Sequence, residues 1–186
     1  MGNDELRLET ARLLLRPTRA EDFDGWAALM GDVEAAQYLG GAQPRAAAWR
    51  GFLAMAGAWQ IQGFAMFSVI EKASGRWIGR VGPWVPEGWP GTEVGWGLIR
   101  EAWGKGYATE AATATIDWAF DTLGWSEVIH VIDPQNTASV TVAERLGSKH
   151  RGVGRLPAPF EHFNVHVWGQ TRGQWRNRTA PQRAVP

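Results

Sequence analysis

Gly104, Lys105 and Gly106 stand directly before a segment with the pattern of a long helix. Apolar residues recur at helical spacing over 108–123, and Gly124 follows them. Glycines leave room for a ligand to approach the backbone closely. The first amides of a helix lack intrahelical partners and lie at the positive end of the helix dipole. With the charge of Lys105, these features predict a site that binds a phosphate group.

The spacing of this loop matches neither of the two common nucleotide-binding motifs. A Walker loop needs Ser or Thr directly after its lysine, and Gly106 stands there. The dinucleotide fingerprint needs another small residue where this chain has Thr109. The spacing alone therefore leaves two interpretations open, an anion site or a glycine-rich turn that binds nothing.

The histidines are a second group that could do chemistry. His162 and His166 alternate along the expected last strand, and Glu161 is the one nearby residue that could complete a metal site. Such a pair is more often part of a polar strand face, so we expect no metal. His130 lies inside the apolar run 128–132, and we expect it to be a hydrogen-bonded core residue.

The composition excludes several classes of protein. The chain has 186 residues, which suits one domain, and it contains no cysteine, so disulfides, thiolate zinc sites and a cysteine nucleophile are excluded. Its 19 basic and 19 acidic residues balance, which argues against a nucleic-acid partner. The N-terminus lacks the pattern of a signal peptide, and no apolar run approaches the ~20 residues that cross a bilayer. We therefore expect a cytoplasmic protein without membrane association.

The hydrophobic pattern predicts one domain over residues 1–172 and a tail over 173–186 that is partly disordered. Expected strands cover 6–16, 64–71, 76–85, 93–99 and 128–132, and a final hairpin ends near residue 169. Expected helices follow the capping-box pair Thr18 and Glu21, cover 45–60 and 107–123, and begin again at the N-cap Asn136. Gly95 and Gly97 interrupt the strand 93–99, which indicates a bulge or the close approach of another molecule.

Three separated segments carry a resemblance to a known family. They are 9–17 (ETARLLLRP), 93–98 with 103–111 (EVGWGL and WGKGYATEA), and 136–140 with 144–147 (NTASV and ERLG). In order and spacing they resemble the GNAT superfamily of N-acetyltransferases, most closely its ribosomal-protein N-terminal acetyltransferase-like branch. The resemblance covers the chain to about residue 172.

The resemblance implies a mixed α/β (α+β) fold, with a mostly antiparallel central sheet and helices on both faces. It implies acetyl-CoA as cosubstrate, with the pantetheine arm along the strand at Gly95 and the pyrophosphate on the amides after Gly104. The phosphate site expected from the residues alone lies at the same loop. The residues that the resemblance assigns to acetyl-CoA are Val94, Gly95, Trp96, Gly97, Leu98, Trp103, Gly104, Lys105, Gly106, Tyr107, Ala108, Thr109, Asn136 and Ser139.

This chain departs from the family pattern at three positions. Glu101 replaces a Gln or Arg before the loop, which matters little because backbone amides bind most of the phosphate. Many members have a tyrosine at the position of Ala143, where it protonates the departing thiolate. In the branch that this chain resembles, a serine matching Ser139 has that role. Members also usually show Gly-Phe where this chain has Gly147 and Ser148.

The implied reaction needs a base, because an amine must lose its proton to attack. Glu93 is the first candidate, acting directly or through a water, and its alternative role is a carboxylate paired with an arginine. Backbone amides at Val94 to Trp96 would stabilise the oxyanion. Ser139 would assist the thiol, or would only hydrogen-bond the cofactor or its own helix turn.

The acceptor is a primary amine that the sequence does not identify further. Trp84, Trp89 and His166 are the candidate substrate-binding residues, and an aromatic groove suits an N-terminal peptide, an aminoglycoside or another small amine. Two alternatives to the transferase remain. One is an acyl-CoA-binding sensor without catalysis, favoured by Ala143, and the other is a nucleotide phosphate at the glycine loop. A homodimer is compatible with this branch.

Overall fold

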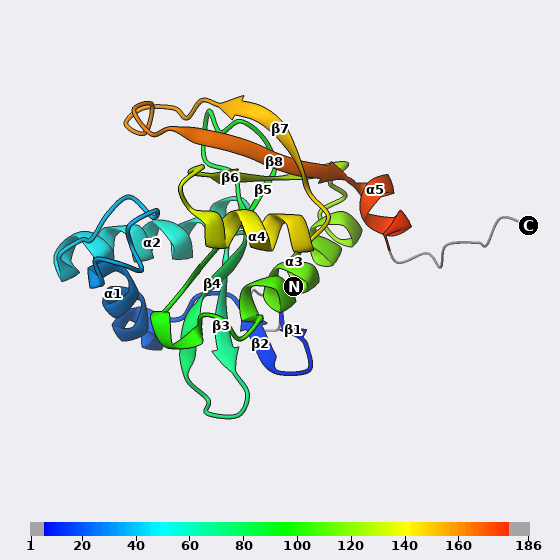
Figure 1. Cartoon of the computed structure of the whole chain (residues 1–186). Helices are drawn as coiled ribbons and strands as arrows, with labels where there is room; N and C mark the ends of the chain where they lie inside the picture. The colour runs from blue at the N-terminus through cyan, green and yellow to red at the C-terminus, as the bar shows by residue number, and fades with distance from the viewer. Residues whose placement is uncertain (1–5, 179–186) are drawn as a thin grey trace, which may run out of the picture.

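A twisted eight-stranded sheet organises the computed structural model, which describes residues 6–178 (Figure 1). Its strand order is β1-β2-β3-β4-β5-β6-β8-β7, and β5–β6 is the parallel pair while the other neighbours are antiparallel. The expected mixed, mostly antiparallel sheet is therefore confirmed. The strands are β1 (Leu8–Glu9), β2 (Leu13–Arg16), β3 (Phe67–Glu71), β4 (Trp77–Trp84), β5 (Glu93–Leu98), β6 (Glu127–Ile132), β7 (Lys149–Gly154) and β8 (Val165–Thr171).

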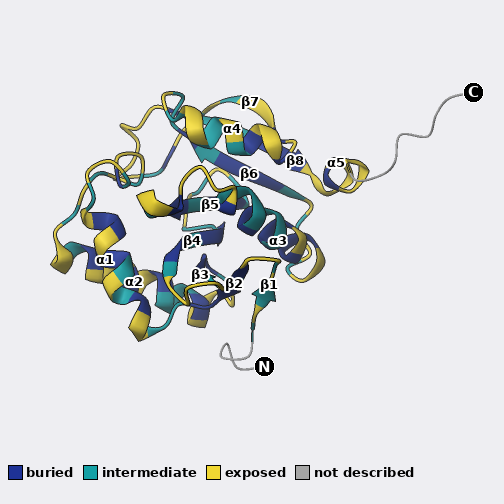
Figure 2. Ribbon diagram, turned by 60° about the horizontal axis from the view of Figure 1, so that its bottom comes forward, coloured by how far each residue is buried: buried dark blue, intermediate teal, exposed yellow. Residues whose placement is uncertain are grey.

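Helices pack on both faces of this sheet, as expected. On one face, Trp26 from the first helix stacks against Arg80. On the other face, Trp96 donates a hydrogen bond to Ser139 from the fourth helix. Buried residues follow the sheet and the helix surfaces turned toward it (Figure 2). The helices are α1 (Phe23–Gly31), α2 (Arg45–Ile61), α3 (Tyr107–Asp121), α4 (Thr137–Arg145) and α5 (Arg172–Asn177).

The segment 6–16 is two short strands and not the single strand that its leucines predict. Thr10 reverses the chain, because its backbone N–H donates to the Leu13 carbonyl and its Oγ1 accepts from the Leu13 N–H, both at 3.0 Å. Threonine competes for backbone bonds in this way at turns. β1 then pairs antiparallel with β2, with Leu8 opposite Leu15. The reversal carries the turn toward the start of α3.

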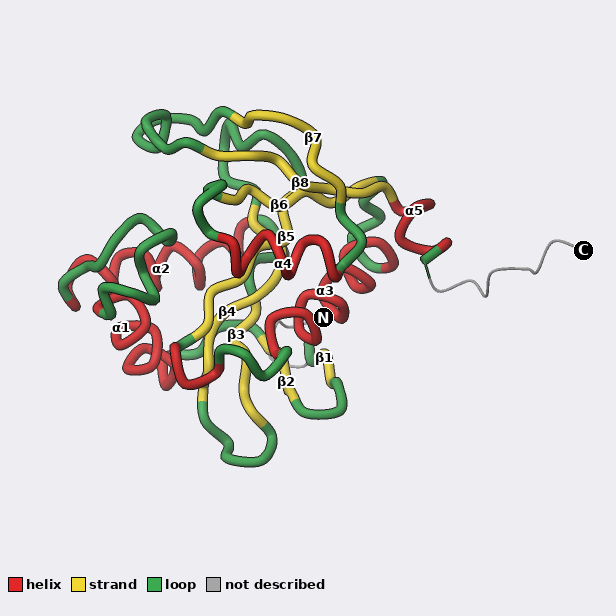
Figure 3. Tube along the Cα trace, viewed as in Figure 1, coloured by secondary structure: helices red, strands yellow, loops and turns green. Residues whose placement is uncertain are grey.

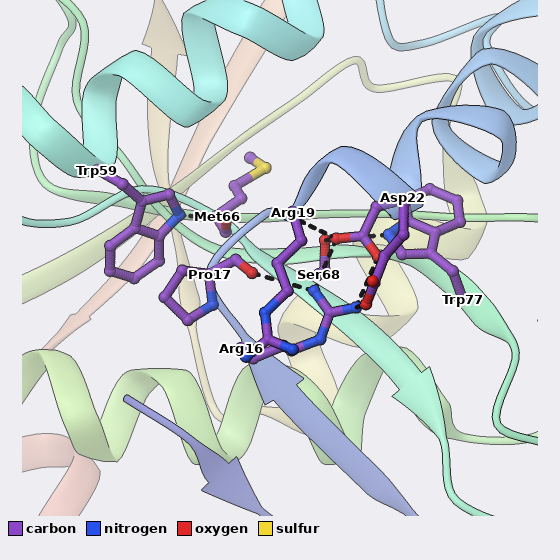
Figure 4. A network of polar contacts seen from close by, with 9 residues as sticks. Arg16, Pro17, Arg19, Asp22, Trp59, Met66, Ser68 and Trp77 are labelled. Carbon is purple, nitrogen blue, oxygen red and sulfur yellow. Dashed lines mark hydrogen bonds and ion pairs between the residues drawn. The ribbon is translucent and has the colours of Figure 1, made fainter. Parts of the chain in front are cut away.

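A buried polar network replaces the capping box expected at Thr18 and Glu21 (Figure 4). Arg16 donates from Nη1 and Nη2 to the two carboxylate oxygens of Asp22, each at 2.8 Å. Asp22 also accepts from the Arg19 backbone N–H at 2.9 Å and from Ser68 Oγ at 2.7 Å. Because Arg16 holds the Asp22 carboxylate inside the protein, Asp22 takes the position of the capping carboxylate. The network fastens the end of β2 to β3 and to the start of α1.

The sheet separates between β5 and β6. β5 pairs with β4 along its whole length, from Glu93 opposite Trp84 to Leu98 opposite Gly79. Its register with β6 consists of one pair, Glu93 and Ile129. Beyond that pair the two strands diverge, so the edge of β5 that faces β6 is left for other partners.

The C-terminal segment expected to be a tail begins with the helix α5. Trp175 of α5 is buried and donates to Asp117 Oδ1 of α3 at 2.6 Å. Residues 179–186 of the expected tail lie outside the described residues. Within 6–178, no helix is long and apolar enough to cross a membrane. The same residues contain no group of three side chains suited to hold a metal ion.

Candidate active site

The glycine loop before α3 has the geometry that an anion site needs. Gly104 and Gly106 have φ values of 72° and 79°, in the left-handed region that favours glycine. A side chain at Gly104 would project into open space, so the loop surface is bare there. Gly106 is the N-cap of α3, and no side chain caps this helix start. The first amides of α3, at Tyr107, Ala108 and Thr109, therefore lie at an uncapped helix N-terminus.

The turn between β1 and β2 is hydrogen-bonded to this loop and to the first turn of α3. Arg12 donates from Nη1 to the Lys105 carbonyl at 2.9 Å and from Nε to Glu110 Oε2 at 2.7 Å. Thr10 Oγ1 donates to Glu110 Oε1 at 2.6 Å. The Lys105 carbonyl is thereby turned toward Arg12, and the N–H of Gly106 in the same trans peptide must point the opposite way. Sequence reasoning missed Arg12 and Glu110, because no local pattern links residues 98 positions apart.

An open cavity of about 600 Å³ adjoins the loop and runs along α3 toward the end of α4. Its volume is within the range of small-molecule sites. Its lining residues are Thr10, Gly106, Thr109, Glu110, Thr113, Ala114, Asp117 and Arg145. Arg145 supplies a cation at the α4 side. This cavity is large enough for the nucleotide end of a ligand whose phosphates lie on the loop.

Trp96 and Ser139 meet on the α4 face of the separated strands. Trp96 Nε1 donates to Ser139 Oγ at 3.1 Å. Asn136 Oδ1 accepts from the Ser139 backbone N–H at 3.1 Å, which confirms Asn136 as the N-cap of α4. Because Ser139 Oγ accepts the indole hydrogen, its own hydroxyl hydrogen can be donated elsewhere. Ala143, one turn further along α4, is fully buried and brings no hydroxyl to this gap.

A buried network holds β5 to β6 where the backbone ladder stops. His130 Nδ1 lies 2.7 Å from the Val94 carbonyl, and its Nε2 lies 2.9 Å from Ser148 Oγ. Ser148 Oγ accepts from Gln170 Nε2 at 2.9 Å, so its hydroxyl can donate to His130 Nε2 and Nδ1–H can donate to Val94. Burial lowers the pKa of His130 to about 4, so the ring is neutral. The expectation of a hydrogen-bonded core histidine is confirmed, and the departure at Ser148 supplies its partner.

Glu93 lies on the opposite face of the sheet from Trp96 and Ser139. It is 6% exposed, and its carboxylate accepts from Trp89 Nε1 at 2.5 Å and from the Val131 backbone N–H at 3.2 Å. Burial raises its pKa to about 7, and the nearby positive charge of Arg80 opposes that shift without a hydrogen bond between the two. A carboxyl that titrates near neutral pH is suited to accept a proton. Of the two roles expected for Glu93, the direct arginine pair is not formed.

The structure brings two of the three candidate acceptor residues to Glu93. Trp84 is its partner across the β4–β5 ladder, and Trp89 bonds its carboxylate. His166 instead pairs with Ile132 and shares the sheet face of His130, and its Nδ1 lies 3.1 Å from His150 Nε2. The loops before β5 and before β8 lie side by side (Figure 3), where a side chain at Gly88 would come within 3.2 Å of Pro157.

Comparisons with known proteins show which family and fold the chain resembles. A family model for the acetyltransferase (GNAT) domain matches residues 12–149. The uncharacterised N-acetyltransferase p20 of Bacillus licheniformis is 30% identical over 151 residues, which are 80% of this chain and 85% of the relative. The uncharacterised protein YkkB of Bacillus subtilis is 36% identical over 87 residues, 46% of this chain, and the match spans only about half (51%) of that protein.

Solved structures share the fold along most of the chain. The crystal structure of an acetyltransferase from Agrobacterium tumefaciens matches with a TM-score of 0.79 and 30% identity, covering 90% of this chain and 95% of that one. The ribosomal-protein-S5-alanine acetyltransferase from Vibrio fischeri has the same fold, with a TM-score of 0.69 and 19% identity, over 92% of this chain and 99% of that one. With the family model across most of its length, the chain belongs to the GNAT family of acetyltransferases.

Proposed function

We propose that this protein transfers an acetyl group from acetyl-CoA to a primary amine that binds on the Glu93 face of the sheet. The observation that carries the proposal is the position of Glu93. Its buried carboxylate, with a pKa raised to about 7, lies at the last paired residue before β5 and β6 separate. A proton acceptor at the mouth of a gap between strands is suited to deprotonate an amine that reaches into the gap.

The residues on the other face fit acetyl-CoA. The uncapped start of α3 and the bare surface at Gly104 suit its pyrophosphate, and the cavity toward Arg145 suits its nucleotide. The edge of β5 around Trp96, which the β6 ladder does not reach, suits the amide groups of the pantetheine arm. Bound there, acetyl-CoA supplies an activated thioester, and a C–N bond forms as the C–S bond breaks.

The roles of the protein's own groups follow from their positions. Glu93 takes the proton of the attacking amine, and Trp89 holds its carboxylate in place. Ser139, whose oxygen accepts from Trp96, donates its hydroxyl hydrogen bond to the departing sulfur. A thiol titrates near ~8.5, so the leaving group needs only modest help. The proton released by the amine balances the one that the thiolate gains.

The acceptor is a protein N-terminal α-amine or a small-molecule amine. Trp84 and Trp89 line its site beside Glu93. The Vibrio fischeri neighbour acts on a ribosomal protein by its name, and at 19% identity its likeness to this chain is one of fold. A cytoplasmic location, the absence of a nucleic-acid partner and a homodimer are part of the same proposal.

Calorimetry with acetyl-CoA, ATP and NAD tests the cofactor, and thiol release over a panel of amines tests the transfer. We expect acetyl-CoA to bind at micromolar strength and the other two not to bind. If acetyl-CoA does not bind, the proposed transferase function is wrong. Binding without thiol release from any amine would support the acyl-CoA sensor, whose structural support is the buried Ala143.

A further inference from the structure

Two buried N–H groups on the Glu93 face have no hydrogen-bond partner within residues 6–178. They are Trp26 Nε1 and Arg80 Nε. The two side chains lie against each other, with the Arg80 guanidinium carbon 4.6 Å from the centre of the Trp26 ring. Trp26 is 4% exposed and Arg80 is partly buried, and both unpaired nitrogens lie below the surface. Buried donors without partners usually cost about 1–3 kcal/mol each, which makes such a pair uncommon.

The protein gives the Arg80 cation little compensation. Its Nη1 donates to Met66 Sδ at 3.6 Å, and a thioether is a weak acceptor. Met66 is itself fixed, because Trp59 Nε1 donates to its backbone carbonyl at 3.2 Å (Figure 4). Burial lowers the pKa of Arg80 to about 10, so the guanidinium remains charged at neutral pH. Glu93 acts on it through space, without a hydrogen bond.

Arg80 and Glu93 lie on one face of the β4–β5 pair, with two glycines of β5 along the strip between them. Arg80 pairs with Gly97, Trp84 pairs with Glu93, and the alternation of a strand places all four on one face with Gly95. A side chain at Gly97 would come within 3.0 Å of Leu39 Cδ1 and 3.9 Å of Arg80 Nε, and one at Gly95 within 2.8 Å of Met66 Cε and 3.3 Å of Glu93 Oε1. The two charged groups therefore border the same glycine strip, one as a carboxylate and the other as a cation with an unpaired donor, and the side chains of Met66 and Leu39 cover that strip.

We propose that the acceptor is an amine that also carries a carboxylate, with its nitrogen at Glu93 and its carboxylate on Arg80 Nε and Trp26 Nε1. This inference rests on the proposed function and narrows its substrate class. An ammonium approaching Glu93 and a carboxylate approaching Arg80 each meet the opposite charge, and both unpaired donors gain an acceptor. A polycation such as an aminoglycoside would meet the Arg80 charge at short range, so the site rejects that part of the panel.

The shared chemistry is a zwitterion, which a free amino acid or an acidic N-terminal residue of a peptide can supply. Thiol release should be measured with matched pairs, each a carboxylate and its carboxamide. One arm uses free amino acids and their amides, and the other uses short peptides beginning with Asp or Glu against Asn or Gln. We expect kcat/KM to favour the carboxylate at least tenfold in one arm, and that arm identifies the source.

Variants then test whether Arg80 and Trp26 are the residues that recognise the carboxylate of the acceptor. Arg80→Gln should reduce the carboxylate preference to about one, mainly through KM, and Arg80→Lys should restore part of it. Trp26→Phe keeps the ring and removes the indole hydrogen, so the preference should fall severalfold in a variant that still folds. Arg50→Gln, at an exposed position on α2, is the matched control and should leave the preference unchanged. Acetyl-CoA binding by calorimetry confirms that each variant is folded.

The failures are distinguishable. If no amine releases thiol in either arm, the proposed function fails and this inference fails with it. Equal use of carboxylates and carboxamides by the wild type would overturn the inference and leave the transferase intact. The inference is equally overturned by a preference that survives both Arg80→Gln and Trp26→Phe.

Discussion

Trp96 and Ser139 are joined by a hydrogen bond of 3.1 Å that connects β5 to α4 where β5 leaves β6. The indole N–H of Trp96 occupies the serine oxygen and orients the hydroxyl. A hydroxyl that already accepts a bond donates more strongly in turn. This contact places the candidate thiol-assisting group at the gap between the strands and makes its role testable.

Ser139→Ala should lower kcat about tenfold, less than the roughly 10²–10⁴-fold typical of general acid–base groups, because the departing thiol needs only modest help. The dissociation constant of acetyl-CoA should change much less, because the helix start and the cavity remain. Trp96→Phe should give a smaller fall in kcat, since the serine keeps its hydroxyl and loses only its orientation. A panel-active enzyme whose kcat is unaffected by Ser139→Ala would reduce Ser139 to a structural role.

Glu93 predicts the pH dependence of transfer. Because its pKa is raised to about 7 and the base form is the ionised one, kcat/KM should fall about tenfold per pH unit below pH 7. The profile should be measured with a weakly basic acceptor, which is already unprotonated in this range. Glu93→Gln should lower the rate at pH 8 by at least tenfold and remove this limb of the profile, while acetyl-CoA still binds. Retention of the limb in the variant would exclude Glu93 as its source.

Arg12 should matter for acetyl-CoA binding although it lies on a distant segment. It fixes the Lys105 carbonyl and neutralises Glu110, so Arg12→Ala should loosen the loop and leave a carboxylate beside the phosphate site. We expect acetyl-CoA to bind roughly tenfold more weakly, equivalent to about 1.4 kcal/mol, with a smaller effect on kcat. Arg7→Ala, at an exposed position close by in the sequence, is the control. If both variants bind acetyl-CoA equally well, the contacts of Arg12 with Lys105 and Glu110 do not position the loop.

Ser148→Ala should destabilise the fold through the network around His130. The substitution leaves His130 Nε2 and Gln170 Nε2 without this shared partner, which should lower the free energy of unfolding by about 1–3 kcal/mol. Urea unfolding measures it, with the exposed Ser126→Ala as control. A midpoint equal to that of the control would mean that the network contributes no stability.

His130 should also make the protein acid-sensitive. Its pKa is about 4 in the folded state, below the usual value near 6.5, so the unfolded state binds the extra proton between these values. The stability that neutral His130 provides is complete above pH ~6.5 and is lost as pH falls toward 4. Glu93, whose pKa is raised, gives the opposite slope between about pH 4.5 and 7. Unfolding curves of His130→Asn should therefore lose less stability on acidification than the wild type; an identical pH dependence would contradict this.

Local signals in the sequence determined the parts of the site that one segment builds alone. The glycine loop, the start of α3 and the Asn136 cap of α4 depend on bonds that span a few residues, and each lies where its pattern predicts. The apolar surroundings of His130 indicated a core histidine with partners, though not which ones. The helices at 45–61 and 107–121 follow the periodicity of their apolar residues.

Only the tertiary structure decided what depends on contacts between distant segments. The turn at Thr10 and its link to Glu110 join positions 100 apart, and the leucine pattern of 6–16 is equally compatible with one strand. Trp175 anchors the beginning of the expected tail through a partner 58 residues away. No short-range rule determines such pairs, because the chain between them must first be arranged by the whole sheet.

Strand register decided the rest of the site. A shift of one residue turns every side chain to the other face, so the sequence could place Glu93, Arg80 and His166 on strands without deciding which of them meet. The ladders put Arg80 and Glu93 on one face and His166 on the other. The sequence by itself determined the family, the glycine loop and Glu93 as a candidate base. The position of Arg80 on the same sheet face as Glu93 depends on strand register, so it exists only after the sheet has formed.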